Sequence, residues 1–265
     1  YIIVFWRLFF SLLLMLPWLI RSGFHVLKIS KLKLFFFRAV IGIIAMLIWF
    51  YALVRLPLPQ ATSLSFTGPI FTTIAAIIFL KERPGIYRIS AILVGFTGVL
   101  IIVRPGFIDF NLATILVLIS TSLWAIAAII IKKLSATEQP KLITFYMASM
   151  MMPIALIFAV FNWQIIELNH VIWLLLIGLT SNFAHNALSK SLSLADVTAI
   201  MPYDFIRLVF VGIFAYILFN DQTNIYDILG SLVIITSNIY ISYRENKLKK
   251  LDLAKVKKIK SLISN

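Results

Sequence analysis

The sequence contains no cysteine and few acidic residues. Among its 265 residues, the lack of cysteine excludes disulfide bonds, thiol catalysis and metal sites built on thiolates. Only 10 aspartates and glutamates stand against 24 lysines and arginines, and charged residues make up just 13% of the chain. A soluble domain of this length would need far more polar surface. The basic residues lie mostly in short connections and a C-terminal tail, so we expect membrane topology to explain them, with no nucleic-acid partner.

Motifs for nucleotide binding and hydrolysis are also missing. The sequence has no GxxxxGKS, GxxxxGKT, HExxH, GxSxG or GxGxxG pattern. This absence argues against an ATP-driven pump working alone and against ordinary hydrolysis within the membrane. We therefore predict that the protein is not an enzyme and that it uses no cofactor and no metal ion.

Long apolar runs, in contrast, recur along the whole chain, and 62% of the residues are hydrophobic. Their lengths suit helices that cross a hydrocarbon core of ~30 Å, and their continuity argues against alternating membrane strands. The sequence begins inside such a run, so we expect a chain that is incomplete at its N-terminus. We predict an all-α polytopic membrane protein with nine spanning segments, at residues 2–20, 34–53, 60–80, 89–103, 111–131, 143–161, 171–188, 197–219 and 225–243.

Lysines and arginines divide unequally between the two sets of connections. One set, which includes the basic tail at residues 244–265, holds 19 of them, whereas the other holds only Arg55 and Arg104. Because positive residues are retained on the cytoplasmic side, we expect a cytoplasmic C-terminus and an outward-facing Tyr1.

The hairpin at residues 60–103 has a looser copy farther along the chain. In the hairpin, two apolar segments flank the turn KERPG, and an offset of 139 residues maps Glu82 onto Asp221 and Tyr87 onto Tyr226. The charge distribution puts the two turns on opposite sides of the membrane, which predicts two inverted repeats. Inversion requires an odd number of spans in each half, so we predict a ten-helix architecture with nine helices present. The repeats are assigned to residues 1–106 and 107–243.

Few polar side chains fall at membrane depth, and each is a candidate for function. Arg7 either faces a central cavity and holds an anionic group, or extends to the outer interface. Arg38 lies near the cytoplasmic start of its segment, so we expect it to extend to the inner surface. Asp204 and Arg207 share a helix face, where they form either a substrate site or a structural ion pair.

The segment at residues 171–188 carries a polar patch of Asn182, His185 and Asn186. His185 is a candidate for proton coupling, and the alternative is a hydrogen bond between helices. Pro69 and Pro202 are predicted helix breaks, which either surround a midplane site or form packing kinks. We predict that the substrate is bound by Arg7, Trp49, Trp124, Asn182, His185, Tyr203, Asp204 and Arg207.

The sequence resembles the EamA-like members of the drug/metabolite transporter superfamily. Residues 51–105, which include the motif LKERP, carry the resemblance, together with residues 191–241 and the opening FWRLFFSLLLMLP at residues 5–17. The resemblance implies ten helices in two inverted five-helix repeats with cytoplasmic termini. Asp221 departs from the family pattern, which has glutamate there. Family substrates include amino acids, nucleotide sugars, drugs and cofactors such as S-adenosylmethionine.

We therefore expect a secondary active transporter of a small organic metabolite in the bacterial inner membrane. The solute would be an amino acid, a nucleotide-like compound or a cofactor-like compound such as S-adenosylmethionine, moved by alternating access. Its other expected partners are the lipid bilayer and, for coupling, protons or a counter-substrate, and it would act as a monomer or homodimer. The alternative is a non-transporting membrane scaffold whose basic tail binds a partner or anionic lipid.

Overall fold

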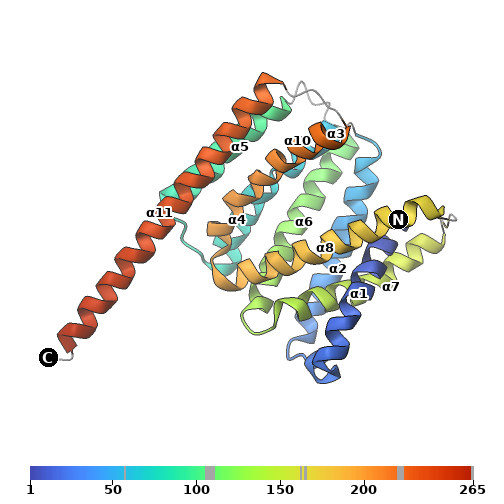
Figure 1. Cartoon of the computed structure of the whole chain (residues 1–265), viewed down its shortest axis with the longest axis horizontal. Helices are drawn as coiled ribbons and strands as arrows, with labels where there is room; N and C mark the ends of the chain where they lie inside the picture. Colours follow the sequence, from blue (N-terminus) through green and yellow to red (C-terminus); the bar gives the residue numbers. More distant parts are fainter. Residues whose placement is uncertain (57, 105–110, 162, 164–165, 220–223, 264–265) are drawn as a thin grey trace. The chain divides into compact units, whose positions relative to one another are not determined.

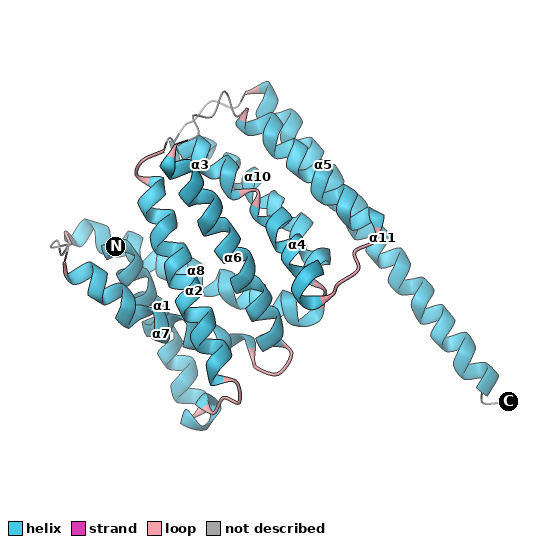
Figure 2. Ribbon diagram, turned by 180° about the vertical axis from the view of Figure 1, so that it is seen from behind, coloured by secondary structure: helices cyan, strands magenta, loops and turns pink. Residues whose placement is uncertain are grey.

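A computed structural model describes residues 1–265 except 57, 105–110, 162, 164–165, 220–223 and 264–265. The described residues form helices and no strands, which confirms the all-α prediction (Figures 1 and 2). Within them, eight helical segments are long and apolar enough to cross a membrane, and Gly68–Leu80 is a shorter apolar helix. The longer helices are α1 (Ile2–Ser22), α2 (Leu32–Leu53), α5 (Ile86–Val103), α6 (Leu112–Ser135), α7 (Pro140–Val160), α8 (Leu168–Leu194), α10 (Ile206–Phe219) and α11 (Ile225–Ile263).

The predicted segment at residues 60–80 is two helices rather than one. Helix α3 (Leu58–Ser65) ends before a turn, and α4 (Gly68–Leu80) begins after it. In the turn, both the amide and the hydroxyl of Thr67 donate to the carbonyl of Leu64, at 3.1 and 2.6 Å. Pro69 lies in the first turn of α4, where its missing N–H leaves no helical hydrogen bond unmade. The helix is therefore interrupted just before Pro69 and not at it.

A second interruption lies in the segment at residues 197–219. Here α9 (Val197–Ile200) is followed by the 3₁₀ helix η2 (Met201–Phe205), which contains Pro202 and leads into α10.

The basic C-terminal tail is helical, because α11 continues from the last predicted span through Ile263. Asp221, the predicted counterpart of Glu82, lies outside the described residues.

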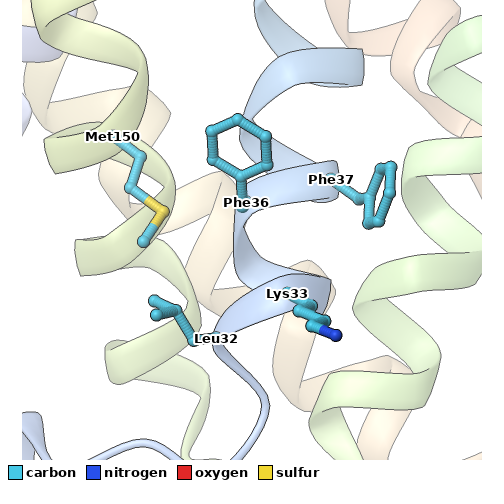
Figure 3. A pocket seen from close by; sticks show the side chains of 5 residues that line it. All are labelled: Leu32, Lys33, Phe36, Phe37 and Met150. Carbon is cyan, nitrogen blue, oxygen red and sulfur yellow. The ribbon is translucent and has the colours of Figure 1, made fainter.

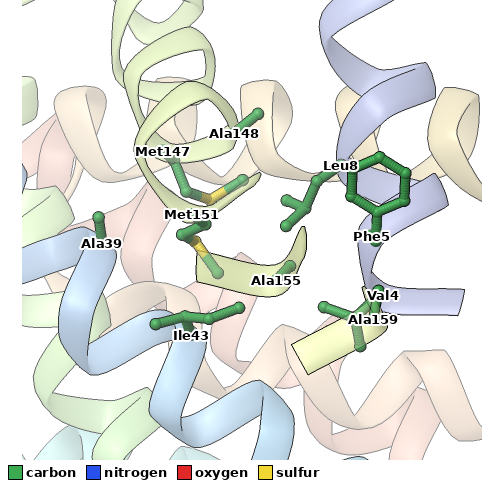
Figure 4. Close-up of a cluster of buried hydrophobic side chains, with 10 residues drawn as sticks. All are labelled: Val4, Phe5, Leu8, Ala39, Ile43, Met147, Ala148, Met151, Ala155 and Ala159. Carbon is green, nitrogen blue, oxygen red and sulfur yellow. The ribbon is translucent and has the colours of Figure 1, made fainter. Parts of the chain in front are cut away.

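The first compact unit comprises Tyr1–Glu82 and Phe107–Ile200. Its principal helix pairs are α2 with α6, α1 with α7 and α8, and α4 with α6. Small residues on α7 let α1 and α2 pack closely against it. A buried apolar cluster fills the space between the three helices (Figure 4). The cluster consists of Val4, Phe5, Leu8, Ala39, Ile43, Met147, Ala148, Met151, Ala155 and Ala159.

The second compact unit comprises Arg83–Gly106 and Met201–Asn265. Helix α5 packs along α11, and two glycines set the approach of these helices (Figure 2). A Cβ added to Gly98 would meet Ile234 Cγ1 at 2.7 Å, and one added to Gly230 would meet the carbonyl oxygen of Gly98 at 2.6 Å. Both positions therefore require glycine. Contacts thus join α5 of the first predicted repeat to α11 of the second, so the compact units do not follow the repeat boundary.

Glu82 and Lys132 hold the junction between α8 and α9. The Glu82 carboxylate accepts from the backbone N–H groups of Val197 and Thr198, at 2.9 and 3.0 Å, and from the Thr198 hydroxyl at 2.7 Å. Lys132 Nζ donates to two carbonyl oxygens at the C-terminal end of α8, both at 2.7 Å. The acidic residue of the LKERP motif therefore satisfies the first amides of α9, which have no partner within the helix.

Candidate solute-binding site

Four side chains from four helices of the first unit meet in a cluster: Arg7 of α1, Arg38 of α2, Trp124 of α6 and His185 of α8. Arg7 Nη2 lies 3.4 Å from His185 Nε2. The His185 ring centroid is 5.7 Å from the Trp124 ring centroid, and Arg38 Cζ lies 5.4 Å from the Trp124 ring centroid. All four residues belong to helices long and apolar enough to span the membrane. We call them the arginine cluster.

Arg38 is buried with 1% of its surface exposed, so the prediction that it extends to the inner surface is wrong. Phe36 and Phe37 occupy the exposed side of α2, which turns Arg38 towards the interior. Gly42 lies one turn farther along, where a Cβ would overlap Arg38 Nη1. Arg38 Nη2 donates to Met147 Sδ at 3.2 Å. The guanidinium is therefore fixed inside the helix bundle, in space that Gly42 leaves open.

Most hydrogen-bonding capacity of the Arg38 guanidinium is unused. Its Nε and Nη1 atoms are buried, and neither has a hydrogen-bond acceptor within the described part of the chain. A guanidinium carries five N–H donors and stays protonated in proteins, so at least three donors remain free. An uncompensated charge of this kind is costly in a low-dielectric interior.

Arg7 uses one donor in its contact with His185. A guanidinium can only donate, so the contact is a hydrogen bond when His185 Nε2 carries no proton and accepts. His185 is buried, with 8% of its surface exposed. Its ring connects the two arginines, since it contacts Arg7 on one side and the Trp124 ring on the other.

No carboxylate among the described residues pairs with either arginine of the cluster. Glu82 is committed to the start of α9, and Glu138 accepts from the hydroxyl of Ser30 at 3.0 Å. Groups of three or more acidic, histidine or cysteine side chains that could hold a metal ion are not found in the described ranges either. The arrangement is therefore cationic and aromatic, which suits an anionic group of a solute.

Asn182 of α8 is engaged in helix packing. Its Nδ2 donates to the carbonyl and hydroxyl oxygens of Ser11 on α1, at 3.0 and 3.3 Å. Its Oδ1 accepts from Asn186 Nδ2 at 2.7 Å. These contacts hold α8 against α1, and they occupy both the donor and the acceptor atoms of the Asn182 side-chain amide.

The other predicted site residues make different contacts. Trp49 packs against a separate buried group of the first unit that includes Ala52 and Val117. Tyr203, Asp204 and Arg207 belong to the second unit, where Arg207 Nη2 and Asp204 Oδ2 are 3.5 Å apart. That ion pair is half exposed, with 54% and 41% of the two side chains accessible. The two predicted breaks, Pro69 and Pro202, lie next to the helix interruptions described above.

A shallow pocket on the first unit contains none of the predicted residues (Figure 3). Leu32, Lys33, Phe36 and Phe37 of α2 and Met150 of α7 line it, and its lining is apolar. Such a surface on a helix of a membrane protein is suited to contact with lipid chains.

Sequence reasoning missed Arg38, Gly42 and Met147 as parts of the site. One signal for Arg38 was present, because Gly42 follows it by four residues and a helix places these two residues on the same face. The contribution of Met147 from α7 depends on how three helices pack, which no local pattern contains.

The helices of spanning length, with Arg38 and His185 buried among them, define a polytopic membrane protein. The chain belongs to the EamA-like transporter family, whose model matches residues 1–104 and 111–243. The predicted family is therefore confirmed, and the protein is a transporter rather than an enzyme.

Several named relatives are bacterial transporters of small metabolites. An S-adenosylmethionine uptake transporter of Rickettsia bellii is 31% identical over 92% of this chain and 84% of its own length. A riboflavin transporter of Brucella anthropi is 31% identical over 92% of this chain and 88% of its own length. One solved crystal structure shares the fold, with a TM-score of 0.76, 11% identity and coverage of 93% of this chain and 89% of its own.

Proposed function

We propose that the protein is a secondary active transporter that moves a small organic metabolite across the bacterial inner membrane by alternating access. The main support is the arginine cluster, because charged side chains inside membrane helices are expensive and usually mark solute or ion pathways. The two interrupted helical segments add to this, since broken helices accompany binding sites in transporters.

The solute class follows from the chemistry of the cluster and from the relatives. Two guanidinium groups with an aromatic wall suit an amino acid, a nucleotide-like solute or a cofactor-like solute such as S-adenosylmethionine, for which several relatives are named. Transport is coupled to protons or to a counter-solute, and the working unit is a monomer or a homodimer. The C-terminus lies in the cytoplasm, as the excess of positive residues in its set of connections requires.

Uptake into proteoliposomes tests this proposal. Purified protein is reconstituted, and accumulation of radiolabelled S-adenosylmethionine, riboflavin and a panel of amino acids is measured with and without an imposed proton gradient. We expect saturable uptake of at least one solute above that of protein-free vesicles. If no solute of the panel accumulates under either condition, the transporter proposal fails and a scaffold role becomes the better account.

A further inference from the structure

We propose that the arginine cluster is a subsite for a single carboxylate, so that the solute of this transporter is a carboxylic acid of the amino-acid type. This inference rests on the proposed function and deepens it. Arg38 provides the principal contact, Arg7 and His185 provide the second side of the subsite, and Trp124 forms its wall.

The centre of the cluster has free hydrogen-bonding capacity. Arg38 Nε and Nη1 are buried and unpaired within the described residues, although the rest of the side chain is held by Met147 and Trp124. Buried donors of a protonated group normally have partners. The absence of a side chain at Gly42 leaves the space that the guanidinium occupies, so the fold specifically accommodates Arg38 at this place. What the site lacks is an acceptor, and a carboxylate offers two acceptor oxygens.

The positive charge of the cluster also favours a carboxylate. Glu82 and Glu138 of the first unit accept hydrogen bonds from Thr198 and Ser30, outside the arginine cluster. A carboxylate of the solute therefore offsets one of the two positive charges without any rearrangement of an existing ion pair. This differs from Asp204 and Arg207 of the second unit, which already neutralise each other.

The surroundings of the cluster favour a carboxylate over a phosphate. Apolar groups lie beside the cluster, because Arg38 contacts Met147, and Met147 and Met151 point from α7 into the space beside Ile43 of α2 (Figure 4). In such surroundings the desolvation cost rises with the square of the charge, whereas the attraction to the arginines rises only linearly. A singly charged carboxylate group is therefore favoured over the doubly charged group of a phosphate monoester.

The test compares matched ligands on matched variants by thermal unfolding in detergent. The ligands are S-adenosylmethionine and methionine, the decarboxylated analogue of each, riboflavin as an uncharged flavin, and adenosine monophosphate as a phosphate. The variants are Arg38→Gln and Arg38→Lys, with Arg55→Gln as the control. Arg55 is exposed and stacks on Tyr51, outside the cluster, so the control removes the same charge elsewhere.

We expect at least one carboxylate ligand to stabilise the wild type and Arg55→Gln, and its decarboxylated analogue to bind about tenfold to hundredfold more weakly. Arg38→Gln should lose this preference, and Arg38→Lys should regain it in part because it restores the charge but not the planar guanidinium. The proposal is overturned if the decarboxylated analogue, riboflavin or adenosine monophosphate stabilises the wild type as well as the carboxylates do, or if no carboxylate stabilises it. Uptake of any solute in the proteoliposome assay would leave the transporter function standing in either case, so the two failures are distinguishable.

Discussion

Replacing Arg38 by methionine should make the ligand-free protein more stable while abolishing solute binding. Methionine is shorter but similar in volume, and it suits a site beside Met147 and Met151. Removing an uncompensated buried charge recovers about 3–5 kcal/mol. Against this stand the contact with Trp124, worth about 1–2 kcal/mol, and the hydrogen bond to Met147, worth about 1 kcal/mol. The net gain is then about 1.5 kcal/mol, within a range of about 0–3 kcal/mol.

For a chain of this size that gain corresponds to a rise in Tm of roughly 3–6 °C. Intrinsic tryptophan fluorescence during heating of the detergent-solubilised protein measures it, and Arg55→Met is the matched control because Arg55 is exposed. A stabilised variant that no longer transports would show that Arg38 is kept for function and not for folding. A fall in Tm of several degrees for Arg38→Met would refute the reasoning, because it would mean that Arg38 stabilises the bundle.

Three further substitutions test the packing that supports the site. Glu82→Gln should lower stability by about 1–2 kcal/mol in thermal unfolding, because the α9 amides lose a charged acceptor, whereas Glu138→Gln at an exposed contact should change it little. Gly98→Leu should cost several kcal/mol and impair membrane insertion or folding yield, whereas Gly212→Leu, at a position with open space, should be tolerated. Asn182→Ala should cost about 0.6 kcal/mol and leave the ligand preference intact, since the amide serves the contact between α1 and α8; a lost preference would assign Asn182 to the site instead.

The fold was largely predictable because apolar length is a direct physical requirement of the bilayer. The helix boundaries within the apolar runs were less predictable from the sequence. The interruption in the segment at residues 60–80 lies just before Pro69 and not at it, because a proline in the first helical turn lacks only an N–H that has no helical partner. The sequence copy of the hairpin likewise did not reveal which helices pack together, since α5 contacts α11 of the other predicted repeat.

The candidate site was predictable only in part. Arg7, Trp124 and His185 were singled out from the sequence, and the structure brings them together. Arg38 was placed wrongly because its position near the segment end allowed either of two directions, and only the packing of α2 against α6 and α7 selects the inward one. Trp49 was grouped with the site because its residue type suits a ligand wall, but its neighbours are apolar side chains.

Solute counterflow tests the central claim of alternating access most directly. Proteoliposomes are preloaded with unlabelled solute, and the initial uptake of the same solute in radiolabelled form is compared with that of empty vesicles, without any ion gradient. A carrier that exposes its site to one side at a time should show faster uptake and transient accumulation in the preloaded vesicles. Uptake that is no faster in preloaded vesicles and only equilibrates, as through an open pore, would contradict the account.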